Sequence, residues 1–327
     1  AMIETNIVVV GGGTGNHTTL SGLRELNCNL SAVVAMTDSG GSSGRLRDEM
    51  GHLPPGDLRQ CLIALASGDH SSTIMKQLFD YRFSAGNGLA GHNFGNLLLT
   101  ALTEITGNTV TAIEEASRLL GIKGSVLPVT LTDATLVARL ADGTELSGES
   151  AIDLRNERLD VKIDFVRLEP KAYVYPPVVD AIAAADVIIL GPGDIYTSVL
   201  PNLLVEDVAE AINSSDAIKI HVCNLMTKPA ESNGFKASDF VRLLLEYLGT
   251  EKPLDYIVVN STPFPDAGQS PTHRWYIPPD DPQWPGSHAK TPRAASPSPT
   301  APAPPPPGYS GEPSSALRTA AHPAGRL

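Results

Sequence analysis

Short apolar runs rich in Val and Ile alternate with amphipathic stretches from residue 6 to about residue 260. The β-branched runs predict strands, and apolar positions that recur every third or fourth residue predict helices. Strands are expected at 6–10, 31–37, 126–130, 161–168, 186–190, 217–223 and 255–259. Helices are expected at 17–26, 57–67, 72–82, 93–105, 111–120, 178–185, 204–213 and 238–248. The alternation predicts an α/β fold with a Rossmann-like, doubly wound, mostly parallel sheet.

Residues 134–150 depart from this alternation. Segments 135–140 and 144–146 flank a short Ala-Asp-Gly turn, which predicts a β-hairpin and hence a small antiparallel insertion. At the helix ends, Thr111 with Glu114 predicts a capping box and Ser238 predicts an N-cap. Gly121 and Gly249 are expected just beyond the ends of their helices.

The composition changes abruptly at about residue 262. Of the 27 prolines, 17 lie in 262–327, and hydrophobic periodicity disappears there. Such a segment buries too little apolar area to offset the entropy of ordering it, so we expect a disordered or polyproline-like tail. A ligand for a proline-recognition module and a frameshifted end are the alternatives. The chain is therefore divided into an α/β domain at 1–261 and a Pro-rich tail at 262–327.

Charge and composition exclude several classes of protein. A net charge of −12 disfavours general binding to nucleic acids or anionic membranes. The three cysteines are widely spaced without a metal-ligand pattern, which indicates reduced, mostly buried thiols. Neither a signal-peptide pattern nor a run of 18 apolar residues is found, so we expect a cytoplasmic protein that does not span a membrane.

The first strand leads into a glycine-rich loop, residues 11–15. Glycines at such a strand-to-helix turn let backbone N–H groups approach an anion, which the positive end of the helix dipole also attracts. The dinucleotide fingerprint Gly-x-Gly-x-x-Gly is matched imperfectly, because Asn16 stands at its sixth position. The Walker lysine is also absent. A tight turn without a ligand is the alternative.

The second strand leads into another small-residue segment, residues 38–45. Asp38 stands where Rossmann proteins place a ribose-binding acid, and it could equally hold a divalent metal beside a diphosphate. Arg45 and Arg47 supply cationic donors suited to phosphate. A flexible surface loop with solvated arginines is the alternative.

Three further segments carry polar residues at expected helix starts or strand ends. Asp57 follows a Pro-Pro-Gly turn and fits an N-cap, with or without a ligand role, and Arg59 lies in the same turn. The second segment has His92 beside two asparagines, where a structural histidine is the alternative, and in the third a Gly-Pro-Gly turn follows the strand at 186–190. Tyr196 is a candidate for stacking on a base or sugar.

Because these loops follow parallel strands, they are expected to gather at one edge of the sheet, where ligands of such folds bind. The candidate ligand-binding residues are Gly12, Gly13, Thr14, Gly15, Asp38, Gly40, Gly41, Ser42, Ser43, Gly44, Arg45, Asp57, Arg59, His92, Asn93, Asn96, Gly191, Pro192, Gly193, Tyr196, Thr197, Ser198 and Asn224. The two glycine-rich loops predict a phosphorylated ligand held between them. No base–nucleophile pair is evident, so catalytic residues are not assigned.

These motifs, in this order, resemble the YvcK-like gluconeogenesis factors of the CofD-like superfamily. The resemblance rests on the segments 11–15, 40–47, 53–59, 91–97, 190–193, 196–198 and 223–227. It implies a Rossmann-like cytoplasmic protein that binds UDP-N-acetylglucosamine and supports cell shape and wall-precursor supply on gluconeogenic carbon sources. It also implies a regulated partner enzyme, and a homo-oligomer is compatible with it.

The superfamily also includes phospholactate transferases, whose resemblance implies transfer of a nucleoside phosphate with Mg²⁺ held by acids after the second strand. Here Asp38 is followed by Ser39 rather than a second acid, which speaks against that activity. No other cofactor is implied, and a dinucleotide-dependent oxidoreductase is disfavoured by Asn16. Family members continue past the strand at 255–259 with a βα segment that carries ligand-side residues. This chain has the Pro-rich tail there, so none of those residues is assigned.

Overall fold

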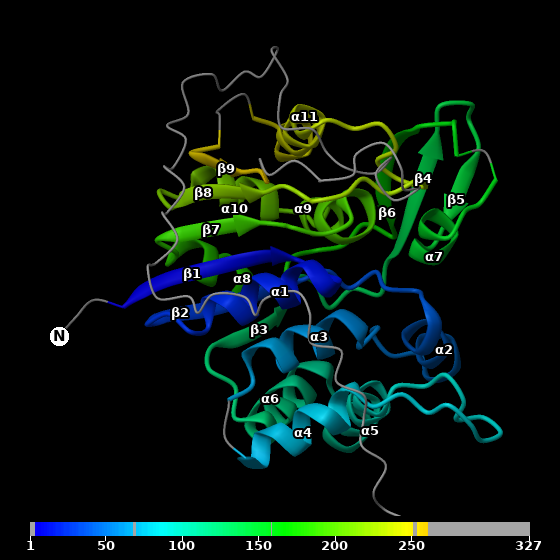
Figure 1. Ribbon diagram of the computed structural model, residues 1–327, viewed down its shortest axis with the longest axis vertical. Helices are drawn as coiled ribbons and strands as arrows, with labels where there is room; N and C mark the ends of the chain where they lie inside the picture. Colours follow the sequence, from blue (N-terminus) through cyan, green and yellow to red (C-terminus); the bar gives the residue numbers. More distant parts are fainter. Residues whose placement is uncertain (1–3, 68–69, 158, 251–253, 261–327) are drawn as a thin grey trace, which may run out of the picture. The chain divides into compact units, whose positions relative to one another are not determined.

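The computed structural model describes residues 4–67, 70–157, 159–250 and 254–260. The tail expected at 262–327 lies outside these residues. A six-stranded parallel sheet forms the centre of the described part, in the order β3-β2-β1-β7-β8-β9 (Figure 1). Its strands are β1 (Thr5–Gly11), β2 (Cys28–Val34), β3 (Ser125–Pro128), β7 (Val187–Leu190), β8 (Ile218–Val222) and β9 (Tyr256–Val258). The predicted doubly wound α/β fold is confirmed.

The helices form two packed groups, as expected for right-handed crossovers that run in opposite directions from β1. The first group, between β1 and β3, comprises α1 (Gly13–Leu23), α2 (Gly41–Met50), α3 (Gly56–Leu65), α4 (His70–Asp80), α5 (Phe94–Thr106) and α6 (Thr109–Leu120). The second group comprises α8 (Pro176–Ala183), the π-helical turn η1 (Ile195–Val199), α9 (Leu200–Leu203), α10 (Val208–Ser214) and α11 (Ala237–Leu248).

A second, antiparallel sheet has the order β5-β4-β6. Strands β4 (Thr135–Leu140) and β5 (Glu145–Ser147) form the predicted hairpin, and α7 (Glu149–Asp153) follows it. The strand predicted at 161–168 exists as β6 (Ile163–Glu169), but it pairs antiparallel with β4 instead of joining the main sheet. The hairpin is thus part of a three-stranded sheet, which lies on the side toward which the β1 arrow points (Figure 1).

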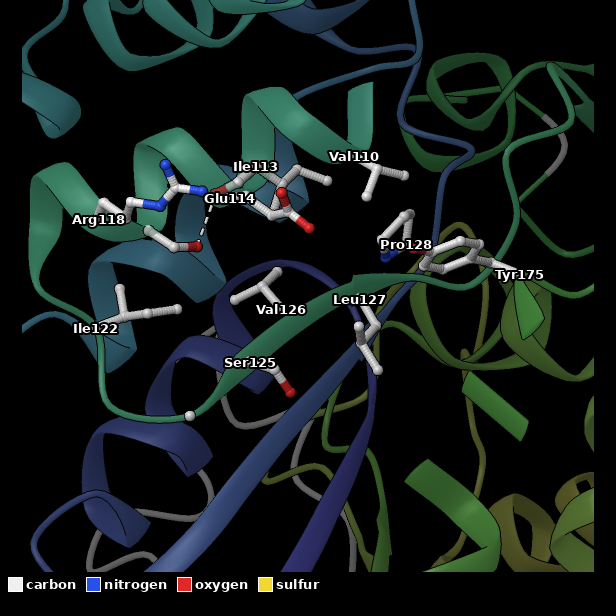
Figure 2. Close-up of a pocket in the computed structure, with 12 residues that line it drawn as sticks. Val110, Ile113, Glu114, Arg118, Ile122, Ser125, Val126, Leu127, Pro128 and Tyr175 are labelled. Carbon is white, nitrogen blue, oxygen red and sulfur yellow. Dashed lines mark hydrogen bonds between the residues drawn. The ribbon is translucent and has the colours of Figure 1, made fainter. Parts of the chain in front are cut away.

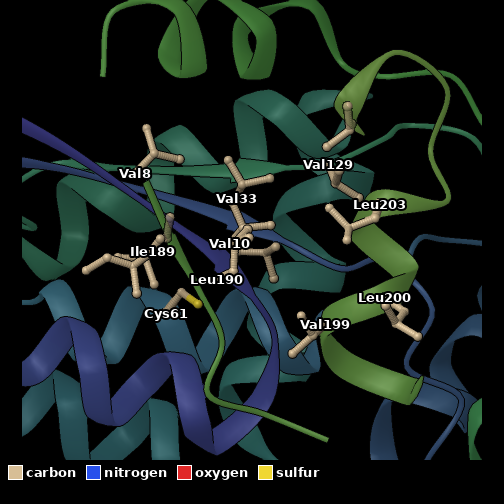
Figure 3. Close-up of a cluster of buried hydrophobic side chains, with 14 of the residues drawn as sticks. Val8, Val10, Val33, Cys61, Val129, Ile189, Leu190, Val199, Leu200 and Leu203 are labelled. Atoms are coloured by element: carbon tan, nitrogen blue, oxygen red, sulfur yellow. The ribbon is translucent and has the colours of Figure 1, made fainter. Parts of the chain in front are cut away.

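The core is built on the apolar strands that the sequence pattern predicted. Val8, Val10 and Val33 from the central strands are at most 2% exposed, and Figure 3 draws them in one buried cluster with Val199 of η1 and Leu200 and Leu203 of α9. Burying one such side chain contributes about 1.5–3 kcal/mol. The cysteines are free thiols, and two of them, Cys61 and Cys223, are buried.

Two of the predicted helix caps are wrong, and two helix ends are confirmed. Asn108, not Thr111, caps α6, because its side chain accepts the Thr111 N–H at 2.8 Å. Lys236 precedes α11, and Ser238 lies within the first turn. Both predictions placed the start too late, because capping residues recur within the first turn. Gly121 and Gly249 follow their helices in the left-handed conformation, as expected.

Strand β3 forms one edge of the main sheet and pairs only with β2 among the described strands. Just after it, the Val129 N–H donates to Val34 O of β2 at 2.9 Å, and Val129 O accepts the Tyr175 N–H at 3.0 Å. Pro128 is the last residue of the strand.

Candidate functional site

The strand order places the topological switch point between β1 and β7, because the chain connections on the two sides of this pair run in opposite directions across the sheet. Rossmann-type sheets bind their ligands at this position. The loops that follow these two strands touch each other. A Cβ added to Gly15 would lie 2.1 Å from the Pro192 carbonyl oxygen, so only glycine allows this approach. Asn16, at the sixth fingerprint position, is fully buried and lies against Gly11. The structure thus brings the first glycine-rich loop together with the Gly-Pro-Gly turn at 191–193, which we call the third loop.

The side chain of Asp57 lies in the first glycine loop. Its carboxyl accepts a hydrogen bond from the Gly13 N–H, and a Cβ on Gly12 would lie 2.3 Å from Asp57 Oδ2. Asp57 is not the N-cap predicted from sequence, since α3 begins at Gly56 and Pro55 precedes it. The Gly13 N–H, one of the backbone donors that were expected to face a ligand, is thus already bonded to this carboxyl.

Asp38 lies between the starts of α2 and α3. Its Oδ1 accepts the Gly40 N–H at 2.8 Å, and a Cβ on Gly56 would lie 2.1 Å from its Oδ2. The segment from Gly41 onward was expected as a loop but forms the first turns of α2. Gly and Ser are poor helix formers, which is why the pattern did not predict this helix. The first backbone N–H groups of α2, which begins just after Asp38, have no partners within the helix.

A third carboxyl, that of Glu149 at the start of α7, was missed by the sequence analysis. Its Oε2 accepts the Ser39 N–H at 3.0 Å, and it shares a hydrogen bond with Asp38. Burial, with the charges of Asp38 and Asp57, raises the pKa of Glu149 to about 9. Burial and the charge of Asp38 raise the pKa of Asp57 to about 7. Glu149 is therefore protonated at neutral pH, and the cluster of Asp38, Asp57 and Glu149 carries less negative charge than three carboxylates.

Most polar residues predicted in the helix starts of α2 and α5 form an internal network. His92 Nδ1 lies 3.2 Å from Ser42 Oγ, and Asn96 Nδ2 donates to Ser43 Oγ at 3.2 Å. Asn93 caps α5 by accepting the Asn96 N–H at 3.1 Å. All five side chains are at most 5% exposed, so they hold α5 against α2 rather than present free groups to solvent.

The arginines predicted for phosphate binding separate into different environments. Arg59 is 5% exposed and donates to Asn96 Oδ1 at 3.0 Å and to Asp80 Oδ1 at 2.9 Å, so its guanidinium is already bound by other protein groups. Arg47 pairs with Asp133 at 2.6 Å. Arg45 is half-buried and donates to the Ala90 carbonyl at 3.2 Å. Of the three, Arg45 therefore stays the candidate for phosphate binding, because it lies near the start of α2 and its bonding partner is a neutral carbonyl.

The third loop is held in place by Asn224, which follows the neighbouring strand β8. Asn224 Oδ1 accepts the Gly193 N–H at 3.2 Å, and its Nδ2 donates to Gly193 O at 2.8 Å. Tyr196 is 4% exposed, with its ring edge-on to Phe235, so the core holds the ring that was expected to stack on a ligand. Thr197 and Ser198 are buried as well.

The residues with accessible surface at this edge are a subset of those predicted, with Glu149 added. They are Gly13, Thr14, Gly15, Asp38, Gly40, Gly41, Arg45, Asp57, Glu149, Pro192, Gly193 and Asn224. We call this set the sheet-edge site. A separate groove of about 340 Å³ runs between α6 and β3 (Figure 2) and contains none of these residues. Within the described residues, no helix has the length and apolar character needed to cross a membrane.

Comparison with known proteins gives consistent matches over most of the chain. Residues 7–276 match the family described as 2-phospho-L-lactate transferase CofD. The gluconeogenesis factor of Bacillus subtilis is 41% identical over 264 residues, which cover 80% of this chain and 81% of that protein. A relative from Nostoc sp. is 48% identical over 254 residues, which cover 78% of this chain and 54% of that protein. The chain thus spans about half the length of that relative.

A solved structure supports the same fold. The crystal structure of protein BH3568 from Bacillus halodurans superposes with a TM-score of 0.76 at 43% identity, covering 81% of this chain and 83% of that chain. The gluconeogenesis factor of Halalkalibacterium halodurans is 43% identical over 266 residues, with about four-fifths of each protein covered.

Proposed function

The chain belongs to the CofD family, in which its relatives are named gluconeogenesis factors, and on that basis we propose that it is a regulator that binds a nucleotide sugar of the UDP-N-acetylglucosamine type. The observation that carries the proposal is the contact between the glycine-rich start of α1 and the Gly-Pro-Gly turn after β7, at the switch point between β1 and β7. In this proposal the protein supports cell shape and wall-precursor supply, and relays ligand occupancy to a partner enzyme.

The diphosphate would lie against the N-termini of α1 and α2. Backbone N–H groups of Thr14 and Gly41 are at exposed positions there, and each helix adds its dipole. Arg45 would exchange the neutral Ala90 carbonyl for a phosphate oxygen, a stronger, charge-assisted bond. Asp38, after β2, would accept hydrogen bonds from ribose hydroxyls, as the acid at this position does in Rossmann folds.

The acidic cluster is compatible with an anionic ligand because its charge is reduced. A protonated Glu149 hydrogen-bonds Asp38, and Asp57 titrates near neutral pH. Carboxyls in this state offer acceptors and donors to sugar hydroxyls with less repulsion of phosphate. A phosphate bound beside Asp57 would favour its protonated form further.

The test is calorimetric titration of the full chain with UDP-N-acetylglucosamine, without metal. We expect saturable binding that Arg45→Ala weakens about tenfold, equivalent to one charge-assisted hydrogen bond. Arg242→Ala is the matched control, because Arg242 is an exposed arginine that pairs with Asp239 on α11. Absence of heat and of a thermal shift on folded protein at millimolar ligand would refute the proposal.

A metal-dependent transferase is the second candidate, favoured by one observation that the sequence did not provide. Asp57 and Glu149 supply, beside Asp38, the additional acids that seemed missing. Carboxylate oxygens are the ligands that Mg²⁺ prefers, so these acids, once deprotonated, are of the right chemical type for that ion. Mg²⁺ held by Asp38 and Asp57 would neutralise the two phosphates of the activated substrate. It would so assist cleavage of the phosphoanhydride bond, in which an acceptor hydroxyl takes the phospholactyl group and the nucleoside phosphate leaves.

The transferase is tested by release of nucleotide or pyrophosphate from a nucleoside-phosphate-activated phospholactate substrate. Mg²⁺-dependent release that Asp38→Asn abolishes and Asp48→Asn leaves unchanged would support it. Asp48 is an exposed acid on α2 and serves as the control. Metal-independent release, or no release above buffer, would refute it and leave the binding proposal intact.

A further inference from the structure

Lys228 lies among three carboxylates beside the third loop of the sheet-edge site. Its Nζ lies 2.6 Å from Asp194 Oδ2 and 3.7 Å from Glu231 Oε1, and it also contacts Asp153 Oδ1. One oxygen from each carboxylate lies within 4.8 Å of the others. We call Asp153, Asp194 and Glu231 the carboxylate cage.

Each carboxylate belongs to a different structural segment. Glu231 is 4% exposed and accepts the Tyr196 N–H at 3.0 Å and the Thr197 hydroxyl at 2.9 Å, so it fixes the start of η1. Asp194 directly follows Gly193 of the sheet-edge site. Asp153 ends α7, the helix that begins at Glu149. The cage therefore joins the third loop to the helix that carries the missed carboxyl.

Three carboxylates at this separation repel one another strongly away from bulk water, and a cation among them removes that repulsion. A lysine ammonium suits the place, because it is a compact charge with three donors for three acceptors. Arg155 is a further cation near Glu231, but its Nε donates to the Ala230 carbonyl at 2.8 Å. Lys228 is the cation that contacts all three members of the cage.

We propose that Lys228 is a positioning residue: its ammonium takes the place of a divalent cation in the carboxylate cage and thereby fixes Gly193 and η1 against α7. This inference deepens the proposed function and rests on it, because Gly193 belongs to the sheet-edge site. Lys228 itself does not touch the ligand in this arrangement. Its contribution to binding passes through Asp194 and Glu231.

The experiment compares Lys228→Met and Lys228→Arg with Lys219→Met. Lys219 is a matched control, because its ammonium donates to the Ser215 and Ala217 carbonyls, away from any carboxylate cage. Mn²⁺ binding is counted by calorimetry without nucleotide. Lys228→Met is expected to bind one more equivalent of Mn²⁺ than wild type, while Lys219→Met binds the same number as wild type.

Ligand affinity is the second measurement. Removing one partner of a buried ionic cluster is costly, so Lys228→Met is expected to weaken UDP-N-acetylglucosamine binding by about tenfold to a hundredfold. Saturating Mn²⁺ should restore the affinity, and Lys228→Arg should stay within about threefold of wild type. Rescue by a metal would not follow from a merely structural defect.

The inference is overturned if Lys228→Met gains no Mn²⁺ site, or if it binds ligand as tightly as Lys219→Met. Should Lys228→Met fail to fold, Lys228→Met/Asp153→Asn decides, because removal of one carboxylate must then restore a cooperative melt. A double variant no more stable than the single one also overturns it. Lack of nucleotide-sugar binding by wild type refutes the proposed function separately, and the Mn²⁺ count still reports on the cage.

Discussion

Asp57→Asn is expected to stabilise the protein, and to do so mainly at neutral and alkaline pH. Burial and the neighbouring charge of Asp38 raise the pKa of Asp57 from 3.8 to about 7. Between these values the folded state holds the proton more tightly than the unfolded state. In wild type, the stabilising effect of this bound proton is fully present below the unfolded pKa and is lost as the pH rises through the folded pKa. The neutral Asn variant does not suffer that loss, so its advantage over wild type grows as the pH rises.

The size of the effect follows from the two pKa values. A rise from 3.8 to about 7 corresponds to about 4 kcal/mol at ~1.36 kcal/mol per pKa unit. Asn resembles the protonated acid in shape and keeps an oxygen that accepts the Gly13 N–H. The substitution therefore removes the charge while leaving the hydrogen bond. Relative to wild type, it should stabilise by about 4 kcal/mol at pH 8 and by under ~1 kcal/mol at pH 4.

Urea unfolding followed by circular dichroism at both pH values measures this difference. Asp48→Asn is the control on the exposed face of α2 and should stay within about 0.5 kcal/mol of wild type at either pH. An equal effect of Asp57→Asn at pH 4 and pH 8, or destabilisation at pH 8, would show that folding does not raise the pKa of Asp57.

Three further predictions concern stability. Gly15→Ala should destabilise by about 1–3 kcal/mol because its Cβ would meet Pro192 O, whereas Gly22→Ala on the same helix has open space and should stabilise by about 0.5–1 kcal/mol, both measured by urea unfolding. Arg59→Met should cost about 1.5–3 kcal/mol in the same assay while the affinity of the folded protein for UDP-N-acetylglucosamine stays within about twofold. Burial lowers the pKa of His221 from 6.5 to about 4, so the contribution of His221 to the free energy of unfolding, measured relative to His221→Gln, should show a loss of about 3 kcal/mol as the pH falls through this interval. His221→Gln should lack that loss, which melting temperatures at pH 7 and pH 4 would show.

The main sheet was predictable because its strands are buried on both faces. Val8 and Val10 belong to a short, continuous apolar run of β-branched residues, which is typical of a buried strand and of few other elements. The glycine loops were equally visible, since Gly15 marks a close approach that any side chain would block. The sequence pattern was thus informative wherever one residue type is physically required.

The acidic cluster was less predictable because tertiary contacts create it. Glu149 follows a hairpin that appeared to be a local insertion, and only the packing of α7 brings it to Asp38. The sequence held one weak signal for this residue: an acidic residue directly after a hairpin, at the edge of the sheet where the strands end. His92 and Asn96 were visible as a polar group, but their partners Ser42 and Ser43 belong to a helix that the pattern did not predict.

The edge strand β3 has a consequence for association between molecules. Because the Val129 N–H points to β2, the backbone groups of Pro128 and Val126 point outward. Proline has no N–H, so Val126 supplies the one outward donor within β3. A strand from another molecule would find one donor, the Val126 N–H, and two acceptors, the carbonyls of Val126 and Pro128, beside the groove of Figure 2. The short strand and its terminal proline therefore weaken pairing at this end of the sheet, so edge-to-edge association through β3 is disfavoured.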